Sequence, residues 1–385
     1  MRILHFVEHF SKPTETFIKR YVEKCMQFSE VAIAAFEFYD VPDDVAENVV
    51  LYSIDNPEFS KKKLSGLKRY VIEKATGKKI WYKQFNEAIE EFRPDIIHCH
   101  FGPMGIELTK FTEKYHLKCP FVTTIYAFDI TMLPLINELY RRDLLPLWQA
   151  TTAVFAEGPA LSKKIFKYGC PPQKCLFNPL IIPINDYPQK THYRSLTDPI
   201  KFLFLGRFIE KKGFHIFLKA VAQLVDQIPA FSIDIVGAGP MQTVFEELIA
   251  TLSLNTQVKW QGLVKHPDVI PMLKDYDFLA HSSLTAENGD DEGGSATIII
   301  EAQAVGLPVI TTRHADIPYV MGYHDFLAEE NDVDSLKAAI IKIVNCENIT
   351  HYIKLGREKV IADHNLNNNR IYEHNLMQVL NSCSA

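Results

Sequence analysis

The chain has 385 residues, of which 47% are hydrophobic and 23% charged, a balance typical of a globular enzyme rather than a disordered or fibrous chain. Its length is about twice that of a typical domain, so two domains are expected. The net charge of −6 argues against a protein that binds nucleic acid.

The cysteines and the hydropathy pattern indicate a cellular location. Seven cysteines are scattered without a CxxC pair, which favours reduced thiols over a disulfide framework. The first residues read as a core strand, not as a signal peptide. No apolar run approaches the roughly 20 residues that a membrane-spanning helix needs. We therefore expect a cytoplasmic protein that does not cross a membrane.

The first half of the chain alternates apolar strand patterns with helical patterns, as in βαβ units. We expect a first helix that opens with residues 14–18 and runs to about residue 25. A second helical region is expected at 60–92 and a third at 159–168. Strands are expected at residues 2–9, 31–36, 49–52, 95–102, 120–126 and 151–156.

Polar residues follow two of these strands. His100 lies at the carboxyl end of the strand at 95–102, which finishes in a polar turn, and Asp129 comes just after the strand at 120–126. Because open α/β sheets bind ligands outside the carboxyl ends of their strands, both residues are candidates for a site. Asp129 could equally serve only as a helix cap. Alternation places His98 and His100 on one face and suggests a metal pair, but no further ligand cluster is apparent, so no metal is expected.

The stretch 61–83 is strongly basic, with Glu73 as its single acid and apolar residues interleaved. One interpretation is a helical region that rests on an anionic membrane, where each basic side chain contributes about 1 kcal/mol. The other is a solvated helical face beside a core stripe.

A run of prolines between residues 170 and 190 predicts the linker between two domains. Strands are then expected at residues 200–205, 231–236, 258–263, 277–281 and 308–311, with two or three helices from residue 334 onward. Gly237 and Gly239 match the start of a dinucleotide fingerprint, but Gln242 stands where its third glycine would be, so the NAD signal is weak. The alternation in both halves predicts two doubly wound domains that face each other across a cleft.

Residues 281–308 read as a polar, acidic loop that runs into a helix. Gly293 and Gly294 permit a tight turn, and Ser295 or Thr297 could supply the oxygen that caps the helix. An ordinary surface loop before a capped helix would show the same pattern.

The start of that helix is a candidate anion site. The amides of Gly294, Ser295 and Ala296 would lie at a helix N-terminus, which favours a phosphate. Glu292 precedes the helix and Glu301 lies about two turns inside it. Two carboxylates around a phosphate site suit a nucleotide sugar, which has phosphates in its middle and hydroxyl-rich sugars at both ends.

Several segments carry a resemblance to one family: Glu15–Ile18, His98–Gly102, Thr123–Asp129, Gly206-Arg207 with Lys212-Gly213, Gly237–Pro240, and Glu292–Pro308. Together they resemble the retaining glycosyltransferases of family 4, in the colanic-acid-type branch that builds bacterial exopolysaccharide, capsule and lipopolysaccharide. The resemblance implies an α/β GT-B fold of two Rossmann-like domains. An acceptor domain at 1–185 and a donor domain at 186–367 are expected, with a C-terminal helix at about 368–385 packing back on the first.

The resemblance also assigns roles on the donor side. By position, Arg207 and Lys212 would clamp the donor diphosphate, because two cations can offset the charge that grows as the phosphate leaves. Glu301 would hold the ribose hydroxyls and Glu292 the transferred sugar, beside the amides of the helix start. The pair Asp290-Asp291 is interpreted as loop acidity, and neither a metal nor another cofactor is expected.

On the acceptor side, His100 and Asp129 would line the reacting centre, and Thr14, Glu15 and Thr16 would lie in the family's first loop, which meets ligands. In this family the leaving phosphate is thought to accept the acceptor's proton, so no enzymic nucleophile is required. The expected activity is a retaining hexosyl transfer from a UDP- or GDP-sugar to a glycan or lipid-linked glycan.

Two other functions remain open at this point. One is a sugar-nucleotide epimerase or a related enzyme on the same double-Rossmann plan. The other is a catalytically silent module that binds nucleotide sugars in a polysaccharide assembly complex. The chain also departs from the family pattern, with one extra residue between Glu292 and Glu301, Ala127 where glycine is usual, and Tyr126 where many relatives have histidine.

Overall fold

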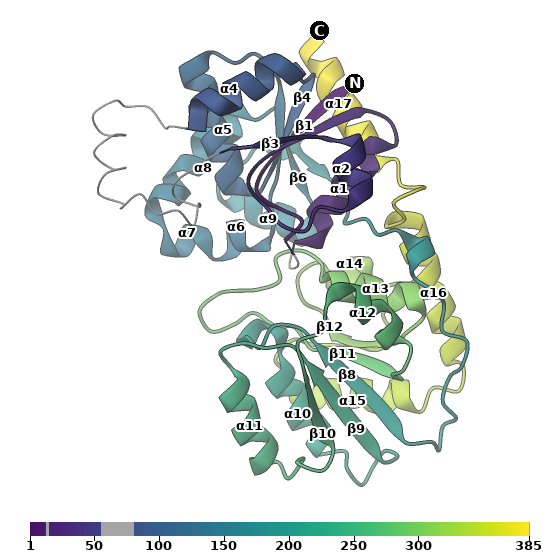
Figure 1. The fold of residues 1–385 in the computed structure, drawn as a ribbon. Coiled ribbons are helices and arrows are strands. Elements are labelled where there is room, and N and C mark those ends of the chain that lie inside the picture. Colours follow the sequence, from purple (N-terminus) through teal and green to yellow (C-terminus); the bar gives the residue numbers. More distant parts are fainter. Residues whose placement is uncertain (13–14, 55–80, 385) are drawn as a thin grey trace. The chain divides into compact units, whose positions relative to one another are not determined.

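A computed structural model describes residues 1–12, 15–54 and 81–384 of the chain (Figure 1). Thr14 and nearly all of the basic stretch 61–83 lie outside these residues. Within the described part of the chain, no helix is both long enough and apolar enough to cross a membrane. The chain divides into a first unit, Met1–Ala156 with Ser162–Pro179 and Arg370–Ala385, and a second unit, Glu157–Leu161 with Leu180–Asn369.

The first unit is built on a parallel sheet of seven strands in the order β3-β2-β1-β4-β5-β6-β7. The strands are β1 (Arg2–Phe10), β2 (Glu30–Phe38), β3 (Val50–Ser53), β4 (Ile96–His100), β5 (Phe121–Thr124), β6 (Ala153–Ala156) and β7 (Cys175–Phe177). Every residue of β4, β5 and β6 is buried, because helices cover both faces of a parallel sheet. These near-continuous apolar runs explain why the strands could be predicted.

The strand β7 corrects one expectation. The proline-rich stretch 170–190 was expected to be a linker without regular structure, yet its residues Cys175–Phe177 pair in parallel with β6. The strand lies at the edge of the sheet, where neighbouring prolines disturb no ladder on the outer side.

Helices cover both faces of this sheet (Figure 1). They are α1 (Thr16–Met26), α2 (Asp43–Asn48), α4 (Trp81–Phe92), α5 (Gly102–Tyr115), α6 (Ala127–Thr131), α7 (Leu133–Ile136), α8 (Glu138–Ala150) and α17 (Ile371–Ser384), while α9 (Pro159–Lys167) begins in the second unit and ends in the first. Trp81 of α4 packs against Phe6 and Phe85, so this helix is held by an aromatic core.

The end of the chain belongs to the first unit. Tyr372 of α17, drawn yellow in Figure 1, is buried, and its hydroxyl lies 2.6 Å from His98 Nδ1 on β4. The Sγ atom of Cys25 and the ring of Tyr21, both on α1, also contact Tyr372. The last helix is thereby fixed to the centre of the first sheet.

The second unit repeats the same plan with six parallel strands in the order β10-β9-β8-β11-β12-β13. Its elements are β8 (Ile200–Leu205), α10 (Phe214–Ala222), β9 (Phe231–Val236), α11 (Gln242–Thr251), β10 (Val258–Gly262), α12 (His266–Leu273), β11 (Phe278–His281), α13 (Thr297–Val305), β12 (Val309–Thr312), α14 (Ile317–Val320), β13 (Leu327–Ala328), α15 (Val333–Val344) and α16 (Ile349–Asp363). The expectation of two doubly wound Rossmann-like domains is confirmed.

Each sheet has one point at which the strand order reverses. In the first unit the point lies between β1 and β4, and in the second it lies between β8 and β11. Open α/β sheets bind their ligands outside the carboxyl ends of the strands at such a point. The loops after β8 and β11 are therefore where a site in the second unit is expected.

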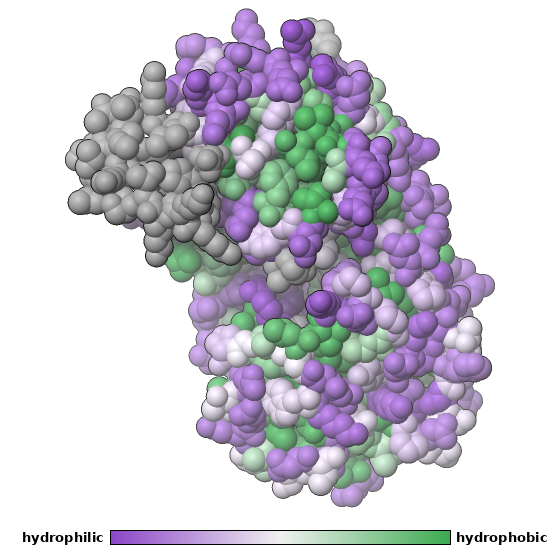
Figure 2. Space-filling view, in the orientation of Figure 1, coloured by the Kyte–Doolittle hydropathy of each residue, from purple (hydrophilic) through white to green (hydrophobic). Residues whose placement is uncertain are grey.

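On the face drawn in Figure 2, hydrophilic side chains predominate and hydrophobic side chains reach the surface in places. In the first unit, large exposed apolar side chains gather on the segment from α6 to α8. They are Phe128, Leu135, Ile136, Leu139 and Leu145. The exposed cations Arg141 and Arg142 belong to the same segment.

The contact between α17 and β4 predicts a measurable loss of stability. In Tyr372→Phe, His98 Nδ1 loses its buried partner, and we expect the free energy of unfolding of the first unit to fall by about 1–3 kcal/mol. Urea unfolding in a Trp260→Phe background measures it, because the remaining tryptophans, Trp81 and Trp148, both lie in the first unit.

The matched control is Tyr115→Phe, where the ring is half-buried and stacks on Phe111. We expect that change to alter stability by no more than about 0.5 kcal/mol. Equal effects of the two substitutions would contradict the anchoring role of Tyr372.

Candidate functional site

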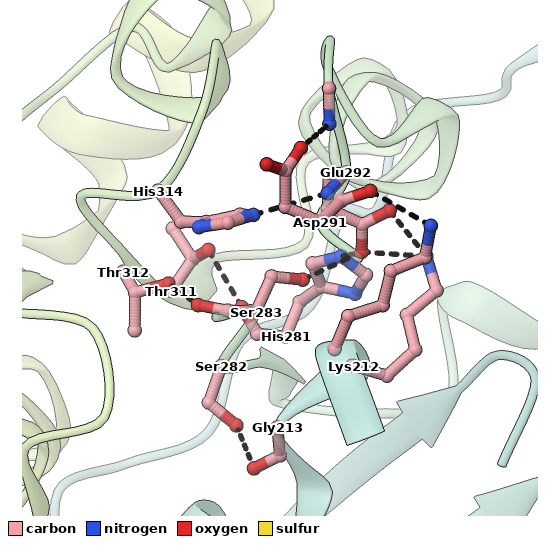
Figure 3. A network of polar contacts seen from close by, with 12 residues as sticks. Lys212, Gly213, His281, Ser282, Ser283, Asp291, Glu292, Thr311, Thr312 and His314 are labelled. Atoms are coloured by element: carbon pink, nitrogen blue, oxygen red, sulfur yellow. Dashed lines mark hydrogen bonds and ion pairs between the residues drawn. The ribbon is translucent and has the colours of Figure 1, made fainter. Parts of the chain in front are cut away.

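The site begins where β8 and β11 end (Figure 3). Gly213 follows the short helix after β8 and has a φ of +66°, a left-handed conformation that suits glycine. A Cβ atom at this position would overlap the carbonyl oxygen of Ser282, just after β11. Ser282 Oγ in turn donates a 2.8 Å hydrogen bond to the Gly213 carbonyl. This close packing holds Lys212 over the end of β11.

Lys212, which is half-buried, forms an ion pair with the buried Glu292 (Figure 3). Its Nζ lies 2.8 Å from Oε1 and 3.0 Å from Oε2 of the carboxylate. Ser283 Oγ donates to Oε1 at 2.8 Å, and His281 Nε2 lies 3.5 Å from the same oxygen. Burial by itself would raise the pKa of Glu292, but Lys212 and His281 together hold it well below its usual value. Lys212, which is expected to bind the phosphate, and Glu292, which is expected to bind the sugar, are thus in direct contact.

The neighbouring lysine has a different role. Lys211 is buried, and its Nζ donates to Asp290 Oδ1 at 2.9 Å and to the carbonyl of Asp291 at 2.8 Å. Asp291 Oδ1 accepts a hydrogen bond from the amide of Gly293. The carboxylates of Asp290 and Asp291 therefore fasten the acidic loop, so that Glu292 is presented to Lys212.

Glu292 is also fixed through its backbone. Its amide donates to His314 Nε2 at 3.2 Å, and His314 Nδ1 is bonded to the carboxylate of Glu330. Thr311 and Thr312 donate to the carbonyls of His281 and Ser283 (Figure 3). The loop before α13 is consequently joined to the ends of β11 and β12.

The start of α13 differs from the expectation. Ser295 or Thr297 was expected to cap the helix, but Ala296 is the N-cap residue and no side chain caps it. Thr297 is already the first helical residue and Ser295 lies one position too early, so neither can act as the cap. The amide of Gly294 bonds to the Glu292 carbonyl at 2.7 Å, closing a tight turn.

The amide of Ser295 faces a buried carboxyl group. Glu157 Oε2 lies 3.2 Å from Ser295 N, and a Cβ atom at Gly294 would overlap the same oxygen. Burial, with the negative charges of Asp316 and Glu292, raises the pKa of Glu157 to about 8. Sequence reasoning missed Glu157, although it directly follows β6 and a strand's carboxyl end is the place to look.

Glu301 lies on the buried side of α13. Its Oε1 accepts a 3.0 Å hydrogen bond from the hydroxyl of Tyr187, and His266 Nε2 lies 2.8 Å from the same oxygen. Tyr187 lies in the proline-rich stretch and His266 opens α12, and no local pattern marked either residue. The carboxylate is therefore held in a fixed direction by two side chains from outside its helix.

Arg207 is exposed and lines a cavity of about 170 Å³ after β8 and β9. The other lining residues are Leu205, Gly206, Val236, Gly237, Ala238, Leu263, Val264 and Val269. A Cβ atom at Gly237 would overlap the carbonyl oxygen of Gly206, so glycine is needed for the two loops to pack. This packing accounts for the glycine that resembled a dinucleotide fingerprint.

In the first unit, a third histidine joins the pair on β4. His5 on β1 pairs with His98 in register, and ligand atoms of His5, His98 and His100 lie within 4.8 Å of one another. The expectation that no further ligand accompanies the histidine pair was therefore wrong, because the register between β1 and β4 cannot be seen in a single sequence. Within the described residues, only this group has the arrangement to hold a metal.

The histidines are linked to hydroxyl groups. His100 Nε2 lies 2.9 Å from His5 Nδ1, and His100 Nδ1 lies 2.9 Å from the hydroxyl of Tyr126. His98 contacts Tyr372 as described, and its Nε2 lies 2.7 Å from Thr124 Oγ1. All three rings are fully buried, and burial lowers their pKa values, to about 3 for His5. Most of the ring nitrogens thus serve a hydrogen-bonded network of neutral imidazoles.

Asp129 has the capping role that the sequence left open. It is buried, and its Oδ2 accepts hydrogen bonds from the amides of Gly102 at 2.9 Å and Tyr126 at 3.1 Å. Burial raises its pKa to about 7, against the effect of these two hydrogen bonds. The carboxyl group therefore joins the starts of α5 and α6.

Two residues of the expected first loop are described. Glu15 precedes α1 and forms a 2.7 Å ion pair with Lys12, without capping the helix, and Thr16 is the first residue of α1. The roles of Glu15, Thr16, His100 and Asp129 toward an acceptor remain predictions.

Sequence comparisons place the chain among known proteins. Residues 189–359 match the family described as glycosyl transferases group 1. The chain is 28% identical over 278 residues to the colanic acid biosynthesis glycosyltransferase WcaL of Escherichia coli (strain K12), covering 71% of this chain and 68% of that protein. It is also 28% identical over 280 residues to the amylovoran biosynthesis glycosyltransferase AmsK of Erwinia amylovora, covering 71% and 67%.

Solved structures share the fold. HepE of Anabaena in complex with UDP has a TM-score of 0.74 at 15% identity, covering 99% of this chain and 100% of that one. The sucrose-phosphate synthase of Thermosynechococcus elongatus has a TM-score of 0.76 at 14% identity, with the same coverage. At these identities the likeness concerns the fold alone.

The histidine cluster predicts how stability depends on pH. The pKa of His5 falls from an ordinary 6.5 to about 3 in the folded chain, so the unfolded chain takes up the proton first as the pH falls. The stability contributed by neutral His5 is complete above pH 6.5 and is lost progressively toward pH 3. In His5→Gln, we expect the slope of unfolding free energy against pH to decrease by up to about 1.4 kcal/mol per pH unit.

Urea unfolding at several pH values, in the Trp260→Phe background, measures this slope. His374→Gln on the exposed side of α17 serves as the control and should leave the slope unchanged. A slope in His5→Gln equal to that of the parent would show that His5 is not held neutral.

Proposed function

We propose that this chain, a member of the group 1 glycosyltransferases with the GT-B fold, is a retaining hexosyltransferase of surface polysaccharide synthesis. It would move a sugar from a UDP- or GDP-sugar to a growing, lipid-linked bacterial glycan. The observation that supports this most is the part-buried ion pair of Lys212 and Glu292 at the strand ends of the second unit. The names of WcaL and AmsK, both polysaccharide biosynthesis glycosyltransferases, support the class of acceptor.

The donor is proposed to bind to the second unit. Lys212 and the exposed Arg207 would hold the diphosphate, with the start of α13 at Gly294, Ser295 and Ala296 beside it. Glu292 would turn to hydroxyls of the transferred sugar, and Glu301 to the ribose. Because Tyr187 and His266 both bond to Glu301 Oε1, we expect the ribose hydroxyls at Oε2.

The reaction is proposed to need no enzymic nucleophile. The bond between the anomeric carbon and the phosphate oxygen breaks, and its electron pair stays on that oxygen. The acceptor hydroxyl attacks from the same face and passes its proton to the leaving phosphate. Lys212 and Arg207 stabilise the growing negative charge, an effect that commonly amounts to a few kcal/mol for a single donor. The described cations would meet this charge without a divalent ion.

The acceptor is proposed to bind to the first unit. His100 and Asp129 are both buried and would act there by holding Tyr126, through its hydroxyl and its amide respectively. Glu15 and Thr16, with Thr14 before them, would contribute from the first loop. Of these residues, the described Glu15 lies just before α1 and Thr16 begins it.

We further propose that the enzyme works in the cytoplasm, at the inner face of the membrane. The basic stretch 61–83 would contribute attraction to anionic lipids. Among described residues, the exposed Leu135, Ile136 and Leu139 lie close in the chain to Arg141 and Arg142, a combination typical of surfaces that enter a bilayer interface.

Replacing the phosphate-binding cation tests the donor site. In Lys212→Met we expect kcat/KM for transfer to fall by roughly 10²- to 10³-fold, because the transition state loses a charge that faces the leaving phosphate. Lys219→Met, on the exposed face of α10, is the matched control and should stay within about twofold of the parent.

Incubation with UDP- and GDP-sugars, with and without an acceptor glycan, separates the alternatives, and calorimetric titration measures donor affinity. A transferase releases free nucleotide only when an acceptor glycan is present, whereas an epimerase-like enzyme alters the sugar without an acceptor. A silent module binds but gives no turnover. Unchanged donor affinity in both Lys212→Met and Glu301→Ala would contradict the proposed site.

Membrane contact is tested by sedimentation with vesicles that contain phosphatidylglycerol. We expect the double substitution Leu135→Ser and Ile136→Ser to lower the bound fraction several-fold, since two exposed apolar side chains are lost. Val244→Ser, an exposed apolar position on α11, should leave binding unchanged. Equal binding of all variants would refute this surface.

A further inference from the structure

Glu157 is a buried acid to which the proposed mechanism gives no role. It belongs to the second unit, and only 7% of its surface is exposed. Its Oε2 faces the amide of Ser295, one of the three amides expected at the phosphate. The amide of Gly294 is already bonded within its own turn. The carboxyl group thus stands where a phosphate was expected to meet the Ser295 amide.

The local backbone is shaped around this carboxyl group. A side chain at Gly294 would overlap Glu157 Oε2, so glycine is required for the acid to approach the turn. The neighbouring Gly158 leaves room for the carboxylate of Asp316, which accepts hydrogen bonds from the amides of Ala160 at 2.7 Å and Leu161 at 3.2 Å. Glu157 is therefore held on a capped helix start and not on a free loop.

The charges that face Glu157 are negative. Asp316 directly precedes α14, and its carboxylate contacts the start of α9. Glu292 lies on the loop before α13. The negative charges of both residues disfavour ionisation of Glu157. Lys212 and His281 approach Glu292 and are engaged there. Together with burial, the main cause, these charges raise the pKa of Glu157 to about 8, so the group carries its proton at neutral pH.

We propose that Glu157 is a further catalytic residue, an uncharged acid that donates a hydrogen bond to the diphosphate of the donor at the start of α13. This inference rests on the proposed function. With Oε2 accepting from Ser295 N, the proton would be carried by Oε1, the oxygen left for a phosphate partner. The carboxyl group then links the helix start to the phosphate through two successive hydrogen bonds, one from Ser295 N to Glu157 and one from Glu157 to the phosphate.

The hydrogen bond would gain strength during the reaction. As the bond to the anomeric carbon breaks, its electron pair remains on the phosphate oxygen, and the added negative charge strengthens every hydrogen bond to that group. The acceptor's proton goes to the phosphate, and Glu157 keeps its own. A carboxyl group that burial keeps protonated is suited to this role, because an ionised carboxylate would repel the diphosphate.

Ionisation of Glu157 should therefore weaken donor binding. Only the protonated form is competent, so the apparent dissociation constant rises as that form is depleted, about tenfold at one pH unit above the pKa. The affinity of the parent protein for UDP or GDP should be steady from pH 6.5 to 7.5 and fall about tenfold by pH 9.

Calorimetric titration of the whole protein with UDP and with GDP over this pH range tests the inference. Glu157→Gln keeps a donor and an acceptor but cannot ionise, so its affinity should match the parent at pH 7 and stay constant to pH 9. Glu157→Ala should bind more weakly at every pH, without the alkaline fall. Glu247→Gln, an exposed acid on α11, is the control and should follow the parent.

Three results would overturn the inference. They are a parent protein with pH-independent affinity, a Glu157→Gln variant with the same alkaline fall as the parent, and a Glu157→Gln variant that no longer binds at pH 7. If the parent binds neither UDP nor GDP at any pH, the proposed function itself fails, which is a distinguishable outcome.

Infrared difference spectra of the parent protein provide a test that needs no variant. At pH 7, addition of UDP or GDP should shift the C=O band of a protonated carboxyl group, because that group gains a phosphate partner. If nucleotide binds but the band does not move, Glu157 does not donate to the diphosphate.

Discussion

The part-buried ion pair between Lys212 and Glu292 is the interaction on which the candidate site of the second unit depends. A buried charge is costly unless it is paired, and loss of one partner leaves the other uncompensated. The close packing of Gly213 against Ser282 and the hydrogen bond from Ser283 hold the two groups together at the ends of β8 and β11. If a donor enters, the lysine can exchange the carboxylate for a phosphate, and the carboxylate can exchange the lysine for sugar hydroxyls. Both charges would stay compensated throughout that exchange.

The two adjacent lysines make different contacts. Lys211 is buried against Asp290 and the Asp291 carbonyl and fixes the acidic loop. Lys212 points to the one carboxylate that this loop presents. The same division holds around α13, where Tyr187 and His266 orient Glu301 while Glu157 approaches Ser295. The site is therefore pre-arranged by groups that lie far apart in the sequence.

Most of the fold could be predicted because parallel strands buried on both faces read as short, largely apolar segments. The strands β4, β8 and β11 were found in this way, and with them the loops that hold Lys212 and Glu292. The three residues of β7 were missed because prolines surround them, and their pairing depends on the neighbouring strand β6. Short pairing at a sheet edge leaves little local pattern.

The site could be predicted only where chemistry and spacing were local. The loop before α13, and Arg207 and Lys212 after β8, carry such patterns. In contrast, His5, Tyr187 and Glu157 reach their partners through tertiary contacts alone. The prediction of the helix cap failed for a different reason. The helix α13 begins at Thr297, so Ala296 is its N-cap residue. A shift of one residue at a helix start changes which side chain can cap, and sequence patterns do not fix boundaries that closely.

A crystal structure with a bound UDP- or GDP-sugar would test the central claim most directly. In that structure we expect Lys212 Nζ to contact the diphosphate, Arg207 to reach the same group, and Glu292 to contact the transferred sugar. A diphosphate bound elsewhere, with Lys212 still paired to Glu292 and Arg207 turned to solvent, would contradict it.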